Sequence, residues 1–152
     1  MTIKIIITVM TLVKEQKKLL LDDLCARLSY SVKGTVKTTD GNGQEITDDG
    51  IINSAFINEH GKAYICIESA EYELEDVKPY LRPMSSMTEE EKTQVQRFMD
   101  IVTDENYGDG YSPSAWDAMN DFVQYCDSHH LDHRGLIFRG LALEAPEGMY
   151  ND

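Results

Sequence analysis

The stretch from residue 50 to residue 83 constrains the fold more than any other part of the chain. Two runs rich in β-branched and aromatic side chains, residues 51–57 and 63–67, flank a short polar segment. Asn58 and Gly61 in that segment accept the positive φ that a tight reversal requires. The pattern predicts a β-hairpin at the centre of the fold.

Further short strands are predicted on both sides of this hairpin. Residues 31–38 alternate between apolar and polar side chains, residues 44–47 precede a turn expected at 48–50, and residues 72–74 form a short β-prone run. Pro79 confines the last segment to a sheet edge or a connector. Because a flat open sheet of this size leaves long edges unpaired, we expect a small, strongly bent antiparallel sheet or an SH3-like or Sm-like barrel.

An amphipathic helix is predicted to precede the strands and to cover them. Residues 12–29 carry apolar side chains at helical spacing, and this pattern puts Asp23 and Arg27 on the opposite, solvent-facing side. The apolar run at residues 3–9 favours an edge strand if it folds.

A helical module is predicted for the second half of the chain. Thr88 and Glu91 have the spacing of a capping box, and a helix is expected from there to residue 102. A third helix follows a loop that is rich in Gly and Asp. Its apolar stripe is expected to hold Trp116, Met119, Val123 and Cys126. The predicted fold class is therefore α+β, with residues 10–83 forming the helix and the sheet or barrel, residues 84–145 the helical module docked on it, and residues 1–9 and 146–152 terminal extensions, the last of them frayed.

The charge balance argues against several kinds of partner. The chain has 27 acidic and 14 basic residues and a formal net charge of −13. Phosphate contacts require Lys or Arg, so binding of duplex nucleic acid through a basic surface is not expected. No apolar segment approaches the roughly 18 residues that span a bilayer, so no membrane partner is expected either.

The cysteines indicate the cellular compartment, and the motifs bear on cofactor binding. Cys25, Cys66 and Cys126 are far apart and lie among apolar neighbours, which predicts buried thiols in a reducing compartment and a cytoplasmic location. Neither a P-loop nor a GxGxxG motif is present, so no cofactor is predicted. The acidic loop at residues 104–110 lacks the terminal Glu of a calcium loop.

The segment at residues 127–133 is the best chemical candidate. His129, His130, His133 and Asp132 offer imidazole and carboxylate groups, which bind divalent metals or act as general bases. The spacing is poor, because adjacent residues on a helix point apart. A polar helix end, where His complements the dipole, is the favoured interpretation, and no catalytic residue is predicted.

A second candidate is an aromatic and basic surface on the sheet and its exit connector. Faces of small barrels commonly hold peptides, nucleotides or RNA. The residues that we expect to bind a partner are Tyr64, Tyr72, Lys78, Tyr80, Arg82 and Arg134.

Three blocks of the sequence, residues 19–28, residues 76–91 and residues 129–137 with 140–145, carry a resemblance to a known family. The chain resembles small uncharacterised proteins encoded on prophages and other mobile elements of Bacteroidales. The resemblance implies an accessory gene product that acts in bacterial cytoplasm. It implies no activity.

Three hypotheses for the function follow. The first is a non-enzymatic binding protein of phage or mobile-element origin that contacts a host or phage protein through the barrel and the connector at residues 77–87. The second is an inhibitor of host defence that mimics nucleic-acid charge or sequesters a small nucleotide. The third is a metal-dependent hydrolase centred on His129, His130 and His133. The sequence leaves the oligomeric state open.

Overall fold

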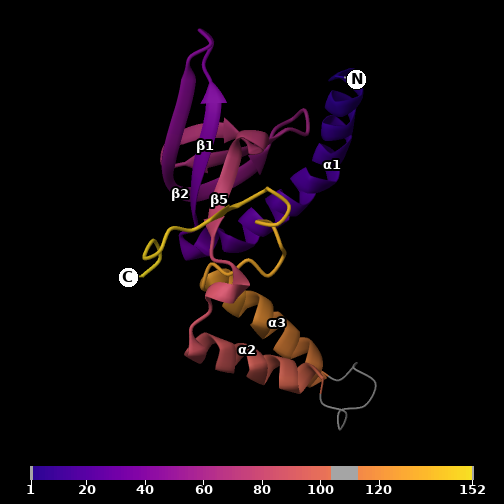
Figure 1. Cartoon of the computed structure of the whole chain (residues 1–152), viewed down its shortest axis with the longest axis vertical. Helices are drawn as coiled ribbons and strands as arrows, with labels where there is room; N and C mark the ends of the chain where they lie inside the picture. Colours follow the sequence, from indigo (N-terminus) through magenta and orange to yellow (C-terminus); the bar gives the residue numbers. More distant parts are fainter. Residues whose placement is uncertain (1, 104–112, 152) are drawn as a thin grey trace.

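A long helix, a six-stranded mixed sheet and a pair of C-terminal helices make up an α+β fold (Figure 1). The computed structural model describes the backbone of residues 2–103 and 113–151 and the side chains of residues 14–103 and 115–151. The elements are α1 (Thr2–Arg27), η1 (Leu28–Tyr30), β1 (Lys33–Thr39), β2 (Glu45–Ile57), β3 (Ala63–Ile67), β4 (Ala70–Glu73), η2 (Leu74–Asp76), β5 (Val77–Leu81), η3 (Met84–Ser86), α2 (Glu89–Val102), α3 (Pro113–Ser128) and β6 (Leu143–Glu144).

The sheet has the strand order β4-β3-β2-β1-β5-β6, and among the described strand pairs only β5–β6 is parallel. The central hairpin, β2 with β3, is confirmed, and so is the bent sheet. The alternative of a closed barrel is wrong, because no pairing joins β4 to β5 or β6 in the described part of the chain. The edge strands β4 and β6 have only four and two residues, so the open sheet exposes little unpaired backbone.

Strand β2 spans 13 residues and serves two partners, because its first half pairs with β1 and its second half with β3. The turn expected at residues 48–50 is therefore wrong, and the two predicted strands are one. A Cβ on Gly50 would lie 2.8 Å from Glu68 Oε1 and 3.0 Å from Ile67 Cγ2. Gly50 thus lets the end of β3 lie close to the β2 backbone, and it does not mark a turn.

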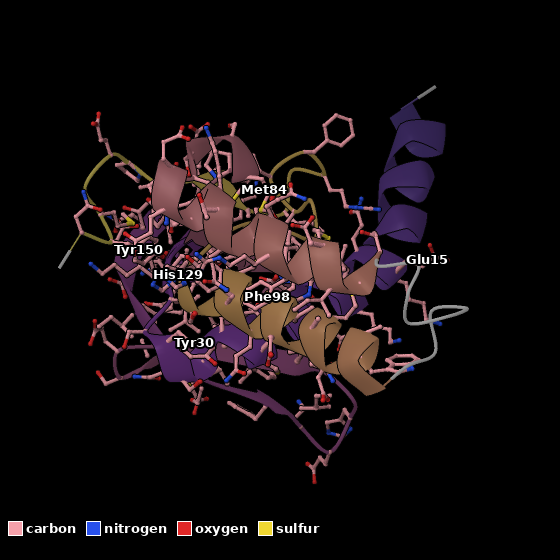
Figure 2. The ribbon with its side chains drawn as sticks, turned by 90° about the horizontal axis from the view of Figure 1, so that it is seen from below. Glu15, Tyr30, Met84, Phe98, His129 and Tyr150 are labelled. Carbon is pink, nitrogen blue, oxygen red and sulfur yellow. The ribbon has the colours of Figure 1, made fainter. Side chains whose placement is uncertain are left out.

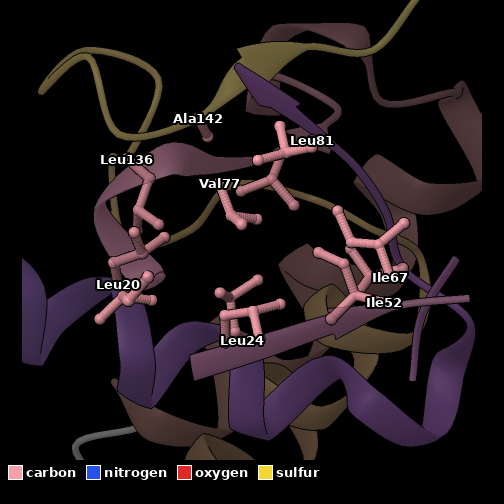
Figure 3. Packing of buried hydrophobic residues seen from close by; sticks show 12 residues of the cluster. Leu20, Leu24, Ile52, Ile67, Val77, Leu81, Leu136 and Ala142 are labelled. Atoms are coloured by element: carbon pink, nitrogen blue, oxygen red, sulfur yellow. The ribbon is translucent and has the colours of Figure 1, made fainter. Parts of the chain in front are cut away.

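The hydrophobic core lies between α1 and the sheet (Figure 3). Leu20 and Leu24 of α1 share one cluster with Ile52 and Ile67 of the hairpin, and Leu136 of the C-terminal segment lies on the Leu20 side of it. Alternation along β5 sends Val77 and Leu81 into the same core, as a half-buried strand requires. The helix predicted to cover the strands is confirmed.

Two expectations about α1 are wrong. The helix begins at Thr2, so residues 3–9 do not form an edge strand. No Gly or Pro interrupts the chain before residue 27, and strand propensity is a weak preference that such continuity overrides. Asp23 and Arg27 are fully buried where solvent exposure was expected, because each finds an oppositely charged partner across the fold.

The C-terminal helices form a hairpin beyond one end of the sheet (Figure 1). The predicted start of α2 is confirmed, because Thr88 and Glu91 form a capping box. The predicted stripe of α3 is confirmed for its second half only: Cys126 is buried and Val123 half-buried, but Trp116 is 59% exposed and Met119 39%. Near the start of the helix the buried residues are instead Ala115 and Ala118, which a search for large apolar side chains does not find. The predicted acidic loop at 104–110 lies outside the described residues.

The three thiols occupy different environments. Only Cys126 is buried, and burial raises its pKa to about 11. Cys66 is half-buried and Cys25 is exposed, so the prediction of buried thiols holds for one cysteine of the three.

Candidate functional site

The three histidines of the predicted chemical segment point to three different partners. The His129 ring stacks on Tyr125 at 4.0 Å between centroids, and its Nδ1 lies 2.8 Å from the Tyr125 carbonyl oxygen. The His130 ring stacks on Tyr150 at 3.6 Å. The His133 Nε2 lies 2.9 Å from Asp127 Oδ1. The imidazoles do not converge, and among the described side chains no group of three or more His, Cys, Asp or Glu is placed to hold a metal ion.

Asp132 and Arg134, which flank His133, also have structural partners. The Asp132 carboxylate accepts hydrogen bonds from the backbone N–H groups of Leu136 and Ile137, at 2.8 and 2.9 Å. It therefore orders the turn after α3 and is not free to bind a ligand. Arg134 donates to Asp23 at 2.7 Å and to Asp127 at 2.9 Å, so its charge faces the interior.

A buried ion network of Asp23, Arg27, Asp127 and Arg134 joins α1 to the end of α3. Arg27 Nε donates to Asp23 at 2.9 Å, and Arg27 Nη2 donates to the Leu131 carbonyl at 2.8 Å and lies 3.5 Å from Asp127. Burial alone raises the pKa of Asp127, but hydrogen bonds from His133 and Arg134 and the charge of Arg27 hold that pKa below its usual value. The network thus keeps Asp127 charged and fixes α1 against the C-terminal segment.

The aromatic and basic surface predicted on the sheet is dispersed. Tyr64 stacks on Phe56 on β2, and the Tyr72 hydroxyl donates to Asp48 at 2.8 Å. The Tyr80 hydroxyl lies 3.4 Å from Asp49, and Lys78 is exposed on β5. Of the six residues predicted to bind a partner, only Arg82 borders the large groove described next.

A groove of about 1000 Å³ lies between the helical hairpin and the C-terminal tail. We call it the acidic groove. Figure 2 shows Tyr150 of the tail and His129, which directly follows α3, at the same end of the helical hairpin. Four segments line the groove: the connector after β5, the start of α2, the end of α3 and the tail. Its lining residues are Arg82, Pro83, Ser86, Thr88, Glu90, Glu91, Tyr125, His129, Glu144, Ala145, Pro146, Glu147, Gly148, Met149, Tyr150 and Asn151.

The one arginine of the acidic groove is already neutralised. Arg82 forms a two-pronged pair with Glu91, at 2.6 and 2.8 Å, and also donates to the His129 carbonyl. The hydrogen bonds from Arg82 lower the pKa of Glu91 to about 2. The remaining acids, Glu90, Glu144 and Glu147, have no ion-pair partner among the side chains described here. The groove therefore carries an unbalanced negative charge.

The tail wall of the acidic groove is held by Tyr150. Its hydroxyl donates to the Tyr80 carbonyl at 2.7 Å and accepts from the Lys33 N–H at 2.9 Å. Burial raises the pKa of Tyr150 to about 12, so it stays protonated. Burial and the nearby charges of Arg27 and Arg82 lower the pKa of its stacking partner His130 to about 4. The expectation of a frayed tail is therefore wrong for residues 146–151.

One feature of the sequence indicates this wall. Tyr150 is an aromatic residue close to the chain end, in a segment otherwise polar and rich in turn residues. Such a residue is often buried, and the tail brings it to the His130 ring and to the backbone of Tyr80 and Lys33.

Comparison of the chain with protein-family models, with curated proteins and with solved structures gives no match. In the part of the chain that is described, none of the helices combines the length and apolar character needed to span a bilayer.

Proposed function

We propose that the protein is a non-enzymatic interaction protein, and that the acidic groove takes an extended segment of a partner protein that carries Lys or Arg side chains. The observation that carries the proposal is the groove itself, about 1000 Å³ in volume, with an internally paired arginine and three unpaired acids. The predicted connector at residues 77–87 contributes Arg82, Pro83 and Ser86 to this groove. The resemblance to mobile-element proteins makes a host or phage protein the expected source of the partner.

The charge of the groove favours a cationic occupant. Glu90 lies at the start of α2, and Glu144 and Glu147 lie on the opposite wall, so acids face the groove from both sides. Complementary charge speeds association and selects the partner more than it adds affinity. The net charge of −13 attracts the same class of partner at longer range.

The shape and the lining favour a peptide. Pro83, Pro146 and Met149 supply apolar contact between the acids. The volume is at the upper end of the range for small-molecule sites, and the lining comes from four separate segments. A chain that alternates cationic and apolar side chains meets both kinds of surface.

The geometry of the acidic groove does not favour nucleotide capture or hydrolysis. Nucleotide capture needs a free cation for the phosphate, and Arg82 is engaged by Glu91. Hydrolysis needs an imidazole free to move a proton, and His129 Nδ1 is engaged by the Tyr125 carbonyl.

The test is a binding titration of the whole chain with a short fluorescein-labelled peptide in which Lys alternates with Leu, followed by fluorescence anisotropy. The triple variant Glu90→Gln, Glu144→Gln and Glu147→Gln is expected to bind about tenfold more weakly, since three exposed charge pairs of about 0.5 kcal/mol each contribute about 1.5 kcal/mol together. A peptide with Glu in place of Lys should not bind.

The matched control removes the same charge elsewhere. Glu45, Glu59 and Glu71 are exposed and lie outside the groove. Their replacement by Gln should change the affinity less than threefold, through the long-range field alone. Equal weakening by both triple variants, or no binding by the wild type, would show that the groove is not the binding site.

A further inference from the structure

The tail that forms one wall of the acidic groove is attached to the sheet at two places. At the first, β6 pairs with β5, and the Ala145 N–H donates to the Leu81 carbonyl at 2.8 Å. At the second, the Tyr150 hydroxyl donates to the Tyr80 carbonyl at 2.7 Å and accepts from the Lys33 N–H at 2.9 Å. Main-chain pairing therefore holds the first attachment, whereas the second depends on a side chain of the tail itself.

The other contacts of the second attachment involve Tyr150 and Lys33 again. The Tyr150 ring stacks on His130 at 3.6 Å between centroids, and Lys33 Nζ lies 5.7 Å from the Tyr150 ring centroid. Lys33 Nζ also donates to the Met149 carbonyl at 3.1 Å. Among the described residues, every hydrogen bond that joins residues 146–151 to the rest of the chain involves Tyr150 or Lys33. The attachment of this segment is therefore concentrated at one aromatic side chain and one lysine.

Glu147 lies between the two attachments and lines the acidic groove. Its side chain is exposed, and the turn around it is closed only by a hydrogen bond within the tail, from the Met149 N–H to the Pro146 carbonyl at 3.1 Å. Glu144, the other acid of this wall, belongs to β6 and is held by main-chain pairing. The place of the Glu147 carboxylate thus depends on Tyr150, and the place of the Glu144 carboxylate does not.

We propose that Tyr150 is a positioning residue of the acidic groove, which holds Glu147 where a cationic side chain of the partner segment binds. This inference rests on the proposed function, because it concerns how the same groove takes its partner. A charged group that is held in place before binding loses little conformational entropy when it pairs, whereas a group on a free segment loses more and pairs more weakly. Glu147 therefore contributes to affinity only while Tyr150 is attached to the sheet.

The test uses the full chain and the same Lys–Leu peptide, followed by fluorescence anisotropy. Tyr150→Ala removes the ring and both hydroxyl hydrogen bonds, and it should weaken binding about fivefold, because the freed wall loses its charge and its apolar contacts. Tyr150→Phe keeps the stack on His130 and should have a smaller effect. Tyr64→Ala removes a ring that stacks on Phe56 outside the groove, and as the control it should leave the affinity unchanged.

A double-mutant cycle separates positioning from a general loss of stability. Glu147→Lys reverses the charge of the tail wall and should weaken binding about tenfold in the wild-type background, but only about twofold in the Tyr150→Ala background. Glu90→Lys reverses a charge at the start of α2, on the opposite wall, and should weaken binding about tenfold in both backgrounds. A merely structural role of Tyr150 would not couple it to one acid and leave the other acid independent.

The outcomes distinguish this inference from the proposed function. If the wild type binds the peptide and Glu147→Lys weakens binding by the same factor in both backgrounds, the positioning role is overturned and the groove remains the binding site. If the wild type does not bind, both proposals are overturned. Urea denaturation shows whether Tyr150→Ala folds. If it does not fold, the same cycle with Tyr150→Phe decides, and additive effects there overturn the inference.

Discussion

Asp127 connects more charged side chains than any other carboxylate described in the structure. It receives hydrogen bonds from His133 and Arg134 and lies beside the fully buried Arg27. Imidazoles and carboxylates within seven residues can indicate a metal or catalytic site, but they also suit a buried salt bridge. Here the second use explains Asp127 and His133, whereas His129 and His130 stack on tyrosine rings and Asp132 accepts backbone hydrogen bonds.

We predict that Asp127→Asn lowers the free energy of unfolding by about 3–5 kcal/mol, because it leaves Arg27 and Arg134 short of a counter-charge in the interior. Urea denaturation measures this. Asp121→Asn, on an exposed position of the same helix, is the matched control and should change stability by about 0.5 kcal/mol or less. Similar losses in the two variants would show that the network does not hold the helices together.

His130 makes stability depend on pH. Its pKa is about 4 in the folded protein and near 6.5 in the unfolded chain, so the unfolded state takes up the proton first as the pH falls. Stability should therefore decrease from pH 6.5 to about pH 4, by about 2 kcal/mol after allowance for partial exposure, and this contribution should level off below pH 4.

The control for this pH dependence is His130→Asn, since Asn also tolerates the φ of 60° at this position. The difference in unfolding free energy between the wild type and this variant should change between pH 7 and pH 4.5. The titration of Glu91 does not obscure this difference, because the stability that the Glu91 carboxylate contributes is lost between pH 4.5 and about 2. Parallel pH profiles for the two proteins would contradict the assignment.

At the scale of elements, the junction between β5 and α2 links the sheet to the helical module. Thr88 Oγ1 accepts from the Glu91 N–H at 3.1 Å, and the Glu91 carboxylate binds both the Thr88 N–H and Arg82. One glutamate thus caps the helix and fixes the connector that borders the acidic groove.

We predict that Thr88→Ala lowers the free energy of unfolding by about 1 kcal/mol through loss of the cap. Glu91→Gln should cost about 2 kcal/mol, because Arg82 loses its partner as well. Glu89→Gln is the control: its side chain is 92% exposed, so the change should stay within about 0.5 kcal/mol. Thermal or urea unfolding of the three variants checks the order. Equal effects of the three substitutions would mean that the junction does not contribute to stability.

Local patterns predicted the elements better than they predicted the buried faces. The hairpin and the capping box depend on neighbouring residues, and both are confirmed. The faces of α1 and α3 depend on partners distant in sequence: Asp23 is buried because Arg134 meets it across 111 positions. Periodicity counts apolar residues and cannot register a buried ion pair or a packing face made of alanines.

At the scale of the whole molecule, local patterns also fail to distinguish an open sheet from a barrel. Strand number and spacing fit both, and the choice is made by β6, a two-residue strand that returns from the end of the chain to pair with β5. The acidic groove arises from the same return, because the tail that follows β6 forms one of its walls. A sequence pattern around residues 77–87 indicated the connector but not the tail that completes the groove.

The central claim is that a partner binds in the acidic groove. Nuclear magnetic resonance of the isotope-labelled full chain, titrated with the Lys–Leu peptide, tests it most directly by the shifts of backbone amides. The largest shifts are expected at residues 82–91, 125–130 and 144–151, which border the groove. Shifts concentrated on β2, β3 and β4, with these three segments unmoved, would contradict the claim.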